Sequence, residues 1–180
     1  RLTEIQDMTT VDTHLDYHAV VIGAGVAGIY QIKRLADLGV RATVLDANPD
    51  LGGTWYNNRY PGARFDSESY TYSYSFSKEL LDEWHWTEKF SPQPETLQYL
   101  NFVVDKFSLR KYMQFDCWVE AMVFDDEANF WTIQLAGDRQ ITTRFVISGM
   151  GVLSTTTLPK FEGMGSFEGK SFHASPWPHE

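Results

Sequence analysis

Three glycines near the start of the chain have the spacing of a phosphate-binding turn. Gly23, Gly25 and Gly28 form the pattern G-x-G-x-x-G directly after the apolar run 17–22, and Asp46 ends the next apolar run. In such a turn the first glycine allows a tight bend, the second admits a pyrophosphate, and the third lets a helix pack on the strand. The acidic residue can accept hydrogen bonds from a ribose. The pattern predicts a dinucleotide site, and both NAD(P) and FAD fit it.

A second glycine motif favours a flavin. Residues 52–55 read GGTW and residues 58–66 read NRYPGARFD. A Rossmann unit for NAD alone is expected to pass from its second strand into another helix. This chain continues instead with glycine, aromatic, arginine and aspartate residues, which could hold and cover a flavin ring. Because linkers are not built from tryptophan and tyrosine, we expect residues 54–89 to form an ordered excursion.

The elements that position these motifs follow from the spacing of apolar residues. Apolar spacing of three and four residues predicts helices at 26–38 and 94–107, and β-branched runs predict strands at 17–22, 41–46, 114–124, 130–135 and 140–148. The strand–helix–strand opening indicates a parallel sheet. We therefore predict an α/β fold, namely a Rossmann-like FAD-binding domain with helices and an antiparallel β excursion.

Composition limits the class of protein. The chain has 180 residues, 43% of them hydrophobic, and a net charge of −9. One domain with a sizeable core is expected, and an acidic chain of this kind is a poor partner for nucleic acid. The apolar stretch 19–30 is broken by three glycines and is too short to span a membrane. Residues 1–16 have no apolar signal region, and the initial Arg1 suggests that the chain does not begin at a first codon.

Cysteine and histidine point to no further chemistry. The single cysteine, Cys117, allows no intrachain disulfide, which suits the cytoplasm. We expect it to be buried and inert, because no histidine pairs with it in sequence. The histidines show no metal-ligand spacing, so no metal is assigned.

The sequence resembles the FAD-binding part of Baeyer–Villiger monooxygenases, which are class B flavoprotein monooxygenases, and most of all the phenylacetone and cyclohexanone monooxygenase branch. The matching segments are GAGVAG (23–28), GGTW (52–55), NRYPGARFD (58–66), YSYSFS (72–77) and FEGKSFHASPWP (167–178). The last fits the family fingerprint F-x-G-x-x-x-H-x-x-x-W-P at Phe167, Gly169, His173, Trp177 and Pro178. Asp46 stands where the family more often has glutamate, but it can still reach a ribose hydroxyl.

The resemblance implies roles for individual residues. Asp66 would act as a catalytic carboxylate near the flavin and nicotinamide, orienting an arginine that lies beyond residue 180. Tyr72 would contact the flavin, and Val119 would meet the adenine through its backbone. The same residues could instead be a loop cap, a core aromatic and a packing residue. The implied cofactor-binding residues are Gly23, Gly25, Gly28, Asp46, Gly53, Thr54, Trp55, Arg64, Asp66, Tyr72 and Val119.

The resemblance also implies an activity and an organisation. FAD and NADPH would be the cofactors, and a ketone would react with O2 through a C4a-peroxyflavin to give an ester or lactone. The alternatives are the FAD domain of an N- or S-oxidising flavin monooxygenase, against which the Trp-Pro ending argues, or a truncated flavin-binding module without activity. We expect a polar lead-in at 1–16 and an FAD domain at 17–160. Residues 161–180 would be a junction to an NADPH domain, with His173 holding the interdomain geometry.

Overall fold

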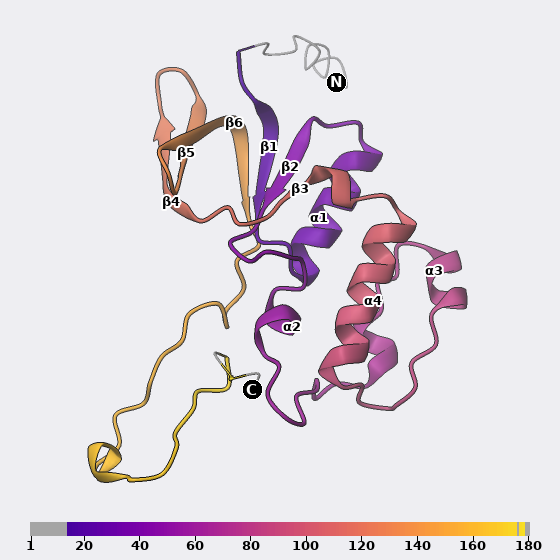
Figure 1. The fold of residues 1–180 in the computed structure, drawn as a ribbon. Helices are drawn as coiled ribbons and strands as arrows, with labels where there is room; N and C mark the ends of the chain where they lie inside the picture. The colour runs from indigo at the N-terminus through magenta and orange to yellow at the C-terminus, as the bar shows by residue number, and fades with distance from the viewer. Residues whose placement is uncertain (1–13, 176, 179–180) are drawn as a thin grey trace, which may run out of the picture.

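A six-stranded sheet with the strand order β3-β2-β1-β6-β5-β4 forms the centre of the protein (Figure 1). The structure is a computed structural model that describes residues 14–175 and 177–178. The strands are β1 (Tyr17–Ile22), β2 (Ala42–Leu45), β3 (Met113–Gln114), β4 (Val119–Asp125), β5 (Phe130–Leu135) and β6 (Arg139–Ser148). The helices are α1 (Val26–Asp37), α2 (Thr54–Asn57), α3 (Lys78–Glu83) and α4 (Gln93–Lys106), with single 3₁₀ turns at Ser69–Tyr72, Arg110–Tyr112 and Met164–Ser166.

The sheet combines a parallel half and an antiparallel half, which confirms the predicted α/β class. Strands β3, β2, β1 and β6 run parallel, whereas β5 pairs antiparallel with both β6 and β4. Strand β1 is central and its last four residues are buried, which is typical of a parallel strand covered on both faces. This explains why 17–22 reads as a continuous apolar run and not as an alternation.

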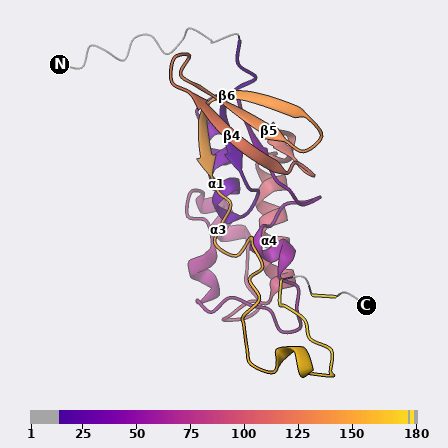
Figure 2. The ribbon, with the colours of Figure 1, turned by 90° about the vertical axis from the view of Figure 1, so that its left-hand side faces the viewer.

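Each face of the parallel half has its own core. On one face, α1 and α4 pack against β1 and β2, with the fully buried Ile29, Leu100 and Val104 among the core residues. On the other face, the β4–β6 meander packs against Val20 and Leu45. Figure 2 shows the meander at the top, with α1, α3 and α4 below it. The glycine turn that follows β1 lies between these two layers of packing.

The single strand predicted at 114–124 is wrong. Residues 113–114 form β3 at one edge of the sheet, whereas 119–125 form β4 at the opposite edge. Between them Asp116 adopts a φ of 53°, and the N–H groups of Asp116 and Cys117 donate to the carbonyls of Asn48 and Asp46 at 3.0 and 2.8 Å. The chain therefore leaves the sheet, binds to the loop after β2 and crosses to the other edge.

The remaining predicted elements are confirmed, with bounds that differ by at most one residue at either end. Two short helices inside the ordered excursion were missed, α2 and α3. Helix α3 had a readable start, because the Ser77 hydroxyl accepts a hydrogen bond from the N–H of Leu80 at 3.2 Å as an N-cap. Cys117 is buried, as predicted.

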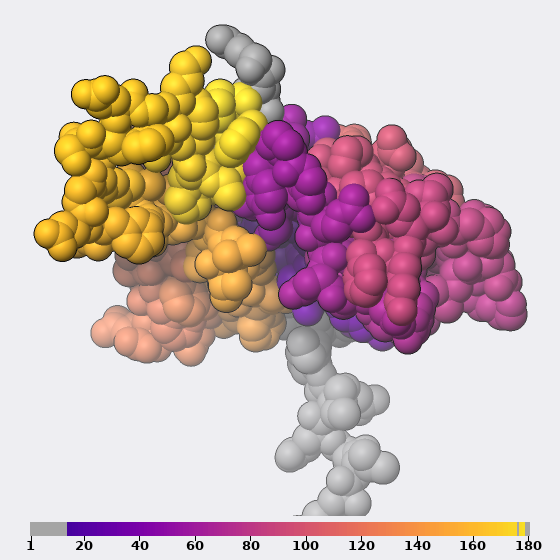
Figure 3. Space-filling view, turned by 90° about the horizontal axis from the view of Figure 1, so that it is seen from below, coloured from indigo at the N-terminus to yellow at the C-terminus, as the bar shows by residue number. Residues whose placement is uncertain are grey.

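After β6 the chain leaves the sheet as an extended segment. Residues 150–172 are exposed, with one 3₁₀ turn at Met164–Ser166, and they form a distinct yellow lobe in the space-filling view (Figure 3). The domain boundary at residue 160 stays a prediction. In the part of the chain that the structure describes, no helix combines the length and the apolar character needed to cross a membrane.

Substituting Gly28 by alanine is expected to destabilise the fold strongly. A Cβ at this position would lie 1.8 Å from the carbonyl oxygen of Gly23, so α1 would have to move away from β1. We expect a loss of about 3 kcal/mol in the free energy of unfolding, measured by urea denaturation. The control is Gly165→Ala, because no atom lies within 4 Å of a Cβ built there. Equal stability of the two variants would contradict this account of α1 packing.

Candidate functional site

The two glycine motifs meet in space, although 24 residues separate Gly28 from Gly52 in the numbering. A Cβ on Gly53 would lie 2.9 Å from the Cα of Gly25, and a Cβ on Gly25 would lie 3.4 Å from the Cα of Gly53. The N–H of Gly52 also donates to the carbonyl of Ala24 at 3.0 Å. The two backbones are therefore in contact, and they leave a surface without side chains beside the start of α1.

A third glycine completes the turn from the end of β6. The N–H of Gly149 donates to the carbonyl of Ile22 at 2.8 Å, and a Cβ on Gly23 would lie 2.7 Å from the Gly149 oxygen. The glycine turn thus lies at the carboxyl ends of β1 and β6. Here the sheet order changes direction, because β2 and β3 extend to one side of β1 and β6 to the other. Such a switch point is where open parallel sheets bind their ligands.

The first turn of α1 offers a site for an anion. Gly25 is its N-cap residue, and the first turn carries no acidic side chain. The first N–H groups of a helix have no partner within the helix, and the positive end of the helix dipole lies with them. With the open glycine surface beside it, this end of α1 fits a pyrophosphate.

Asp46 is buried and already holds the glycine turn. One of its oxygens accepts a hydrogen bond from the N–H of Ala24 at 2.6 Å. The other accepts from the backbone and side-chain nitrogens of Asn48 at 2.8 and 2.9 Å. Sequence reasoning gave Asp46 only a ribose contact, which stays a prediction. The structure adds a role in fastening the turn to the end of β2.

Aromatic side chains form the other wall of the site. The buried Trp55 donates through Nε1 to the hydroxyl oxygen of Tyr72 at 2.6 Å. Phe65 stacks on Tyr72, with ring centroids 4.5 Å apart and an interplanar angle of 5°. Burial raises the pKa of Tyr72, and the hydrogen bond from Trp55 offsets part of that rise. Tyr72 is therefore a neutral phenol at physiological pH.

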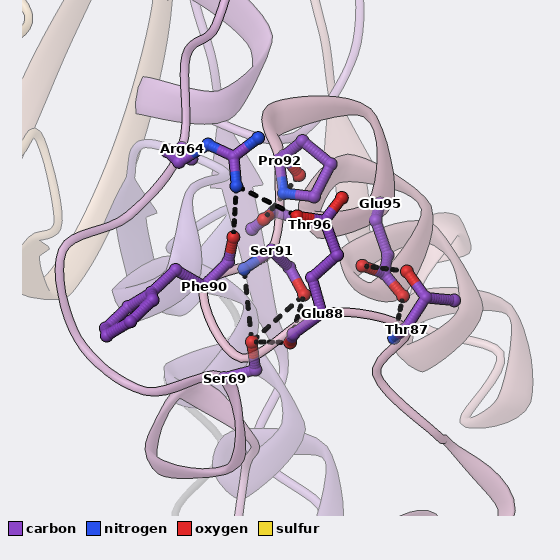
Figure 4. A network of polar contacts seen from close by, with 9 residues as sticks. All are labelled: Arg64, Ser69, Thr87, Glu88, Phe90, Ser91, Pro92, Glu95 and Thr96. Carbon is purple, nitrogen blue, oxygen red and sulfur yellow. Dashed lines mark hydrogen bonds and ion pairs between the residues drawn. The ribbon is translucent and has the colours of Figure 1, made fainter.

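The predicted residues Arg64 and Asp66 lie on the surface on either side of Phe65. The Arg64 guanidinium pairs with Glu88 at 2.9 Å and also donates to the carbonyl of Phe90 at 2.9 Å (Figure 4). Asp66 is exposed. Their predicted contacts with NADP and the flavin stay predictions. In the structure both residues flank Phe65, whose ring packs against Trp55.

Sequence reasoning missed the polar groups that hold this loop. The buried Gln93 donates through its side chain to the carbonyl of Trp55, and its N–H donates to Ala63 at 2.8 Å. The Ser69 hydroxyl donates to the carbonyl of Glu88 at 2.6 Å and lies 3.0 Å from the Ser91 hydroxyl (Figure 4). The only sequence signal was a cluster of polar residues at the Pro-bounded start of α4.

The remaining predicted residues lie at the starts of α2 and β4 and in the fingerprint segment, and Thr54 directly follows Gly53. Val119 begins β4 and is half-buried, while Thr54 begins α2. In the fingerprint, a Cβ on Gly169 would lie 2.5 Å from the ring of Phe167, so this glycine makes room for that ring. His173 accepts a hydrogen bond from the N–H of Ser175 at 3.1 Å. The ring of Trp177 lies 5.6 Å from that of Phe172, so the contacts of the fingerprint residues are local.

Together these features define a dinucleotide-binding Rossmann-like unit. A family model described as an NAD(P)-binding Rossmann-like domain matches residues 21–84, which include both glycine motifs and Asp46.

The resemblance to Baeyer–Villiger monooxygenases is confirmed, because the chain is homologous to part of them. It is 44% identical over 160 residues to the 2-oxo-Δ3-4,5,5-trimethylcyclopentenylacetyl-CoA monooxygenase of Pseudomonas putida, covering 89% of this chain and 29% of that protein. It is 39% identical over 175 residues to a Baeyer–Villiger monooxygenase of Pseudooceanicola batsensis, covering 97% and 32%. A phenazine N-monooxygenase of Lysobacter antibioticus is 41% identical over 167 residues, covering 92% and 30%.

Solved structures agree. The structure of the monooxygenase OTEMO in complex with FAD and NADP superposes with a TM-score of 0.83 at 43% identity, covering 91% of this chain and 31% of that one. The chain therefore spans about a third of the length of the relatives it matches.

Removing the Asp46 carboxylate is expected to destabilise the glycine turn. Asp46→Ala leaves the N–H groups of Ala24 and Asn48 without their acceptor, at a cost of about 1–3 kcal/mol for each buried group. Asp46→Asn keeps one acceptor oxygen and should lose less. Urea unfolding without cofactor measures both. The control Asp37→Ala removes only a surface pair with Lys33 and should cost less than about 1 kcal/mol; a similar loss in all three variants would disprove the fastening role.

Stability is expected to fall as the pH rises above about 10. Burial raises the pKa of Tyr72, Tyr74 and Tyr99 above the ordinary value of 10.0. In the unfolded chain these phenols lose their protons near that value, whereas the folded protein keeps them protonated. Because the unfolded state then binds fewer protons, each further rise in pH favours unfolding.

Urea unfolding across an alkaline pH series measures this effect, and phenolate absorbance follows the ionisation itself. Tyr74→Phe should make the decline less steep, because it removes one buried phenol. If all the tyrosines of the folded protein ionised together near pH 10, the account would be wrong.

Proposed function

We propose that this chain is the FAD-binding part of an NADPH- and O2-dependent Baeyer–Villiger monooxygenase that oxidises ketones to esters or lactones. The observation that carries the proposal is the contact of Gly25 with Gly53 beside the start of α1. It joins a dinucleotide turn to the GGTW motif in a chain 43% identical to part of a protein solved with FAD and NADP.

The residues present fit FAD. The N–H groups at the start of α1 would bind the pyrophosphate beside the Gly25–Gly53 contact, and Asp46 would face the ribose. Val119 would approach the adenine through its backbone. FAD, when bound, supplies the redox chemistry that accepts hydride and activates oxygen. The chain's own part is to bind and orient it, and the packed aromatic rings of Trp55 and Tyr72 keep water from one side of the site.

The loop around Phe65 would serve the second cofactor. Arg64 carries a positive charge at the surface, and Asp66 is exposed, as contact with a nicotinamide requires. We propose Asp66 as the catalytic carboxylate and Arg64 as a contact for NADP. Thr54, at the start of α2, would lie along the ribityl chain.

Two features support a larger enzyme around this part. Strand β6 pairs with β5 through residues 139–143 and with β1 through residues 143–148. Within the described residues, no strand pairs with the second edge of 144–148. Exposed apolar side chains follow in the segment after it, with Val152 at 95% exposure. We propose that later parts of the enzyme cover both, that residues 161–180 are the junction to an NADPH domain, and that the lone Cys117 reflects a cytoplasmic location.

One comparison favours a second candidate function. The phenazine N-monooxygenase is as similar to this chain as the ketone-oxidising relatives are. Oxidation of a ring nitrogen would use the same two cofactors, so the FAD-binding part alone does not separate the two reactions. The Trp177–Pro178 ending favours the Baeyer–Villiger reaction.

The chain is expected to bind FAD, and Gly25→Val should weaken that binding. A Cβ on Gly25 would already lie 3.4 Å from the Cα of Gly53, so the valine methyl groups would push the two backbones apart and cover the glycine surface that a pyrophosphate needs. A titration followed by flavin fluorescence should show at least about a tenfold rise in Kd, or 1.4 kcal/mol. Gly165→Val is the control, because its surroundings are open.

The activity is tested in a longer protein that contains this chain and the proposed NADPH domain. NADPH consumption is measured with a cyclic ketone and with an aromatic N-heterocycle, and the products are identified. An ester or lactone supports the main proposal, and an N-oxide supports the second candidate. Absence of FAD binding in both proteins would refute both.

A further inference from the structure

A row of aromatic rings runs from the GGTW motif to the protein surface. Trp55 meets Phe65 edge-on at 5.7 Å between ring centroids, and Phe65 meets Trp86 edge-on at 5.8 Å. Trp86 in turn lies 5.6 Å from Trp84 and 4.9 Å from Tyr99. All these centroid distances fall in the range of direct ring contact. No step in the row is wider than one such contact.

The two ends of the row lie in different surroundings. Trp55 is 7% exposed and follows the Gly25–Gly53 contact by two residues. Trp84 and Trp86 are half-buried and line a shallow surface pocket with Tyr70 and His85. The row therefore connects the interior of the candidate flavin site to a place that solutes can reach.

The rings differ in how easily they give up an electron. Tryptophan and tyrosine are the aromatic side chains that can be oxidised by one electron under mild conditions, whereas phenylalanine can only bridge two such rings. Oxidation of a tyrosine also requires loss of its phenolic proton, and burial raises the pKa of Tyr72 and Tyr99. The indole of Trp86 donates to the Ser73 hydroxyl at 2.9 Å, while Trp84 Nε1 has no acceptor within the described residues. The three tryptophans are therefore the better carriers.

We propose that Trp55, Trp86 and Trp84 form an electron relay that carries oxidising equivalents from the flavin site to the surface. The relay rests on the proposed function, because it requires a flavin beside Trp55. The photoexcited flavin, the one-electron oxidant of this scheme, takes one electron from Trp55 and is itself reduced by one electron. Trp86 returns an electron to Trp55 through the ring of Phe65, and Trp84 returns one to Trp86.

The electrons that the relay carries come from a thiol at the protein surface. A thiol in solution gives one electron to the oxidised Trp84 and releases its proton to water. Two of the resulting thiyl radicals combine to a disulfide, so two one-electron events consume two thiols and reduce the flavin by two electrons in total. O2 then takes these two electrons and two protons from the flavin and leaves as hydrogen peroxide. A site that handles oxygen with a flavin is exposed to misdirected oxidation, and this route would spare the residues that bind the cofactor.

The test uses the chain loaded with FAD, whose photoexcited flavin is a one-electron oxidant. A light flash should quench the flavin emission and produce a long-lived tryptophan radical, detected by transient absorption, whose decay glutathione accelerates. Trp86→Phe should keep the quenching by Trp55 but lose the long-lived, thiol-sensitive signal. Retained quenching also shows that this variant is folded around its cofactor.

Two further variants sharpen the result. Trp84→Phe should keep a radical on Trp86 but reduce its reaction with glutathione. Trp131→Phe is the matched control, because this tryptophan packs against Phe124 in the meander, outside the row. A long-lived thiol-sensitive radical that persists in Trp86→Phe overturns the relay alone. Failure of the chain to hold FAD overturns the proposed function and the relay with it.

Discussion

The contact between the backbones at Gly25 and Gly53 is the constraint on which the site depends. A Cβ on Gly53 would lie only 2.9 Å from the Cα of Gly25, so no side chain fits between the two backbone segments. Ala24, the residue before Gly25, is held by two hydrogen bonds. Its N–H donates to Asp46, and its carbonyl accepts from the N–H of Gly52. The start of α1 is therefore fixed by backbone contacts, and its N–H groups stay free of competing side chains. A phosphate site needs this arrangement, because it binds to backbone groups that must already be in place.

The same contact explains which parts of the molecule could be predicted from sequence. A phosphate turn restricts residue types at fixed positions, so G-x-G-x-x-G, its flanking strand and helix, and Asp46 were all readable. The strand predicted at 114–124 failed for the opposite reason. Apolar alternation predicts that a segment forms a strand, but it does not predict at which edge of the sheet that strand lies. The sign of φ at Asp116, where the chain turns away, is not encoded in that pattern.

The excursion after the second motif shows another limit. Its order comes from ring contacts and buried polar groups, which have no sequence period. Trp55 is held by Phe65, by Tyr72 and by the side chain of Gln93, which come from three separate parts of the chain. Gln93 stands before a proline in a polar stretch and reads as a surface residue. In the fold Gln93 is buried, and its side-chain amide donates a hydrogen bond to the carbonyl of Trp55. A buried carbonyl needs such a donor, and the sequence does not show which residue provides it.

The residues proposed to bind the flavin differ in burial and in contacts from those proposed for NADP and for the substrate. The former are buried or half-buried and are held by the two cores of the sheet and by hydrogen bonds. Asp66 and the fingerprint residue Phe167, by contrast, are exposed, and the contact recorded for Phe167 is with its near neighbour Gly169. A preorganised site loses little order when its ligand binds, whereas exposed groups need a partner surface to fix their geometry. The groups proposed for the first cofactor are thus largely preorganised within this chain. The groups proposed for the second cofactor acquire a defined geometry only against the remainder of the enzyme.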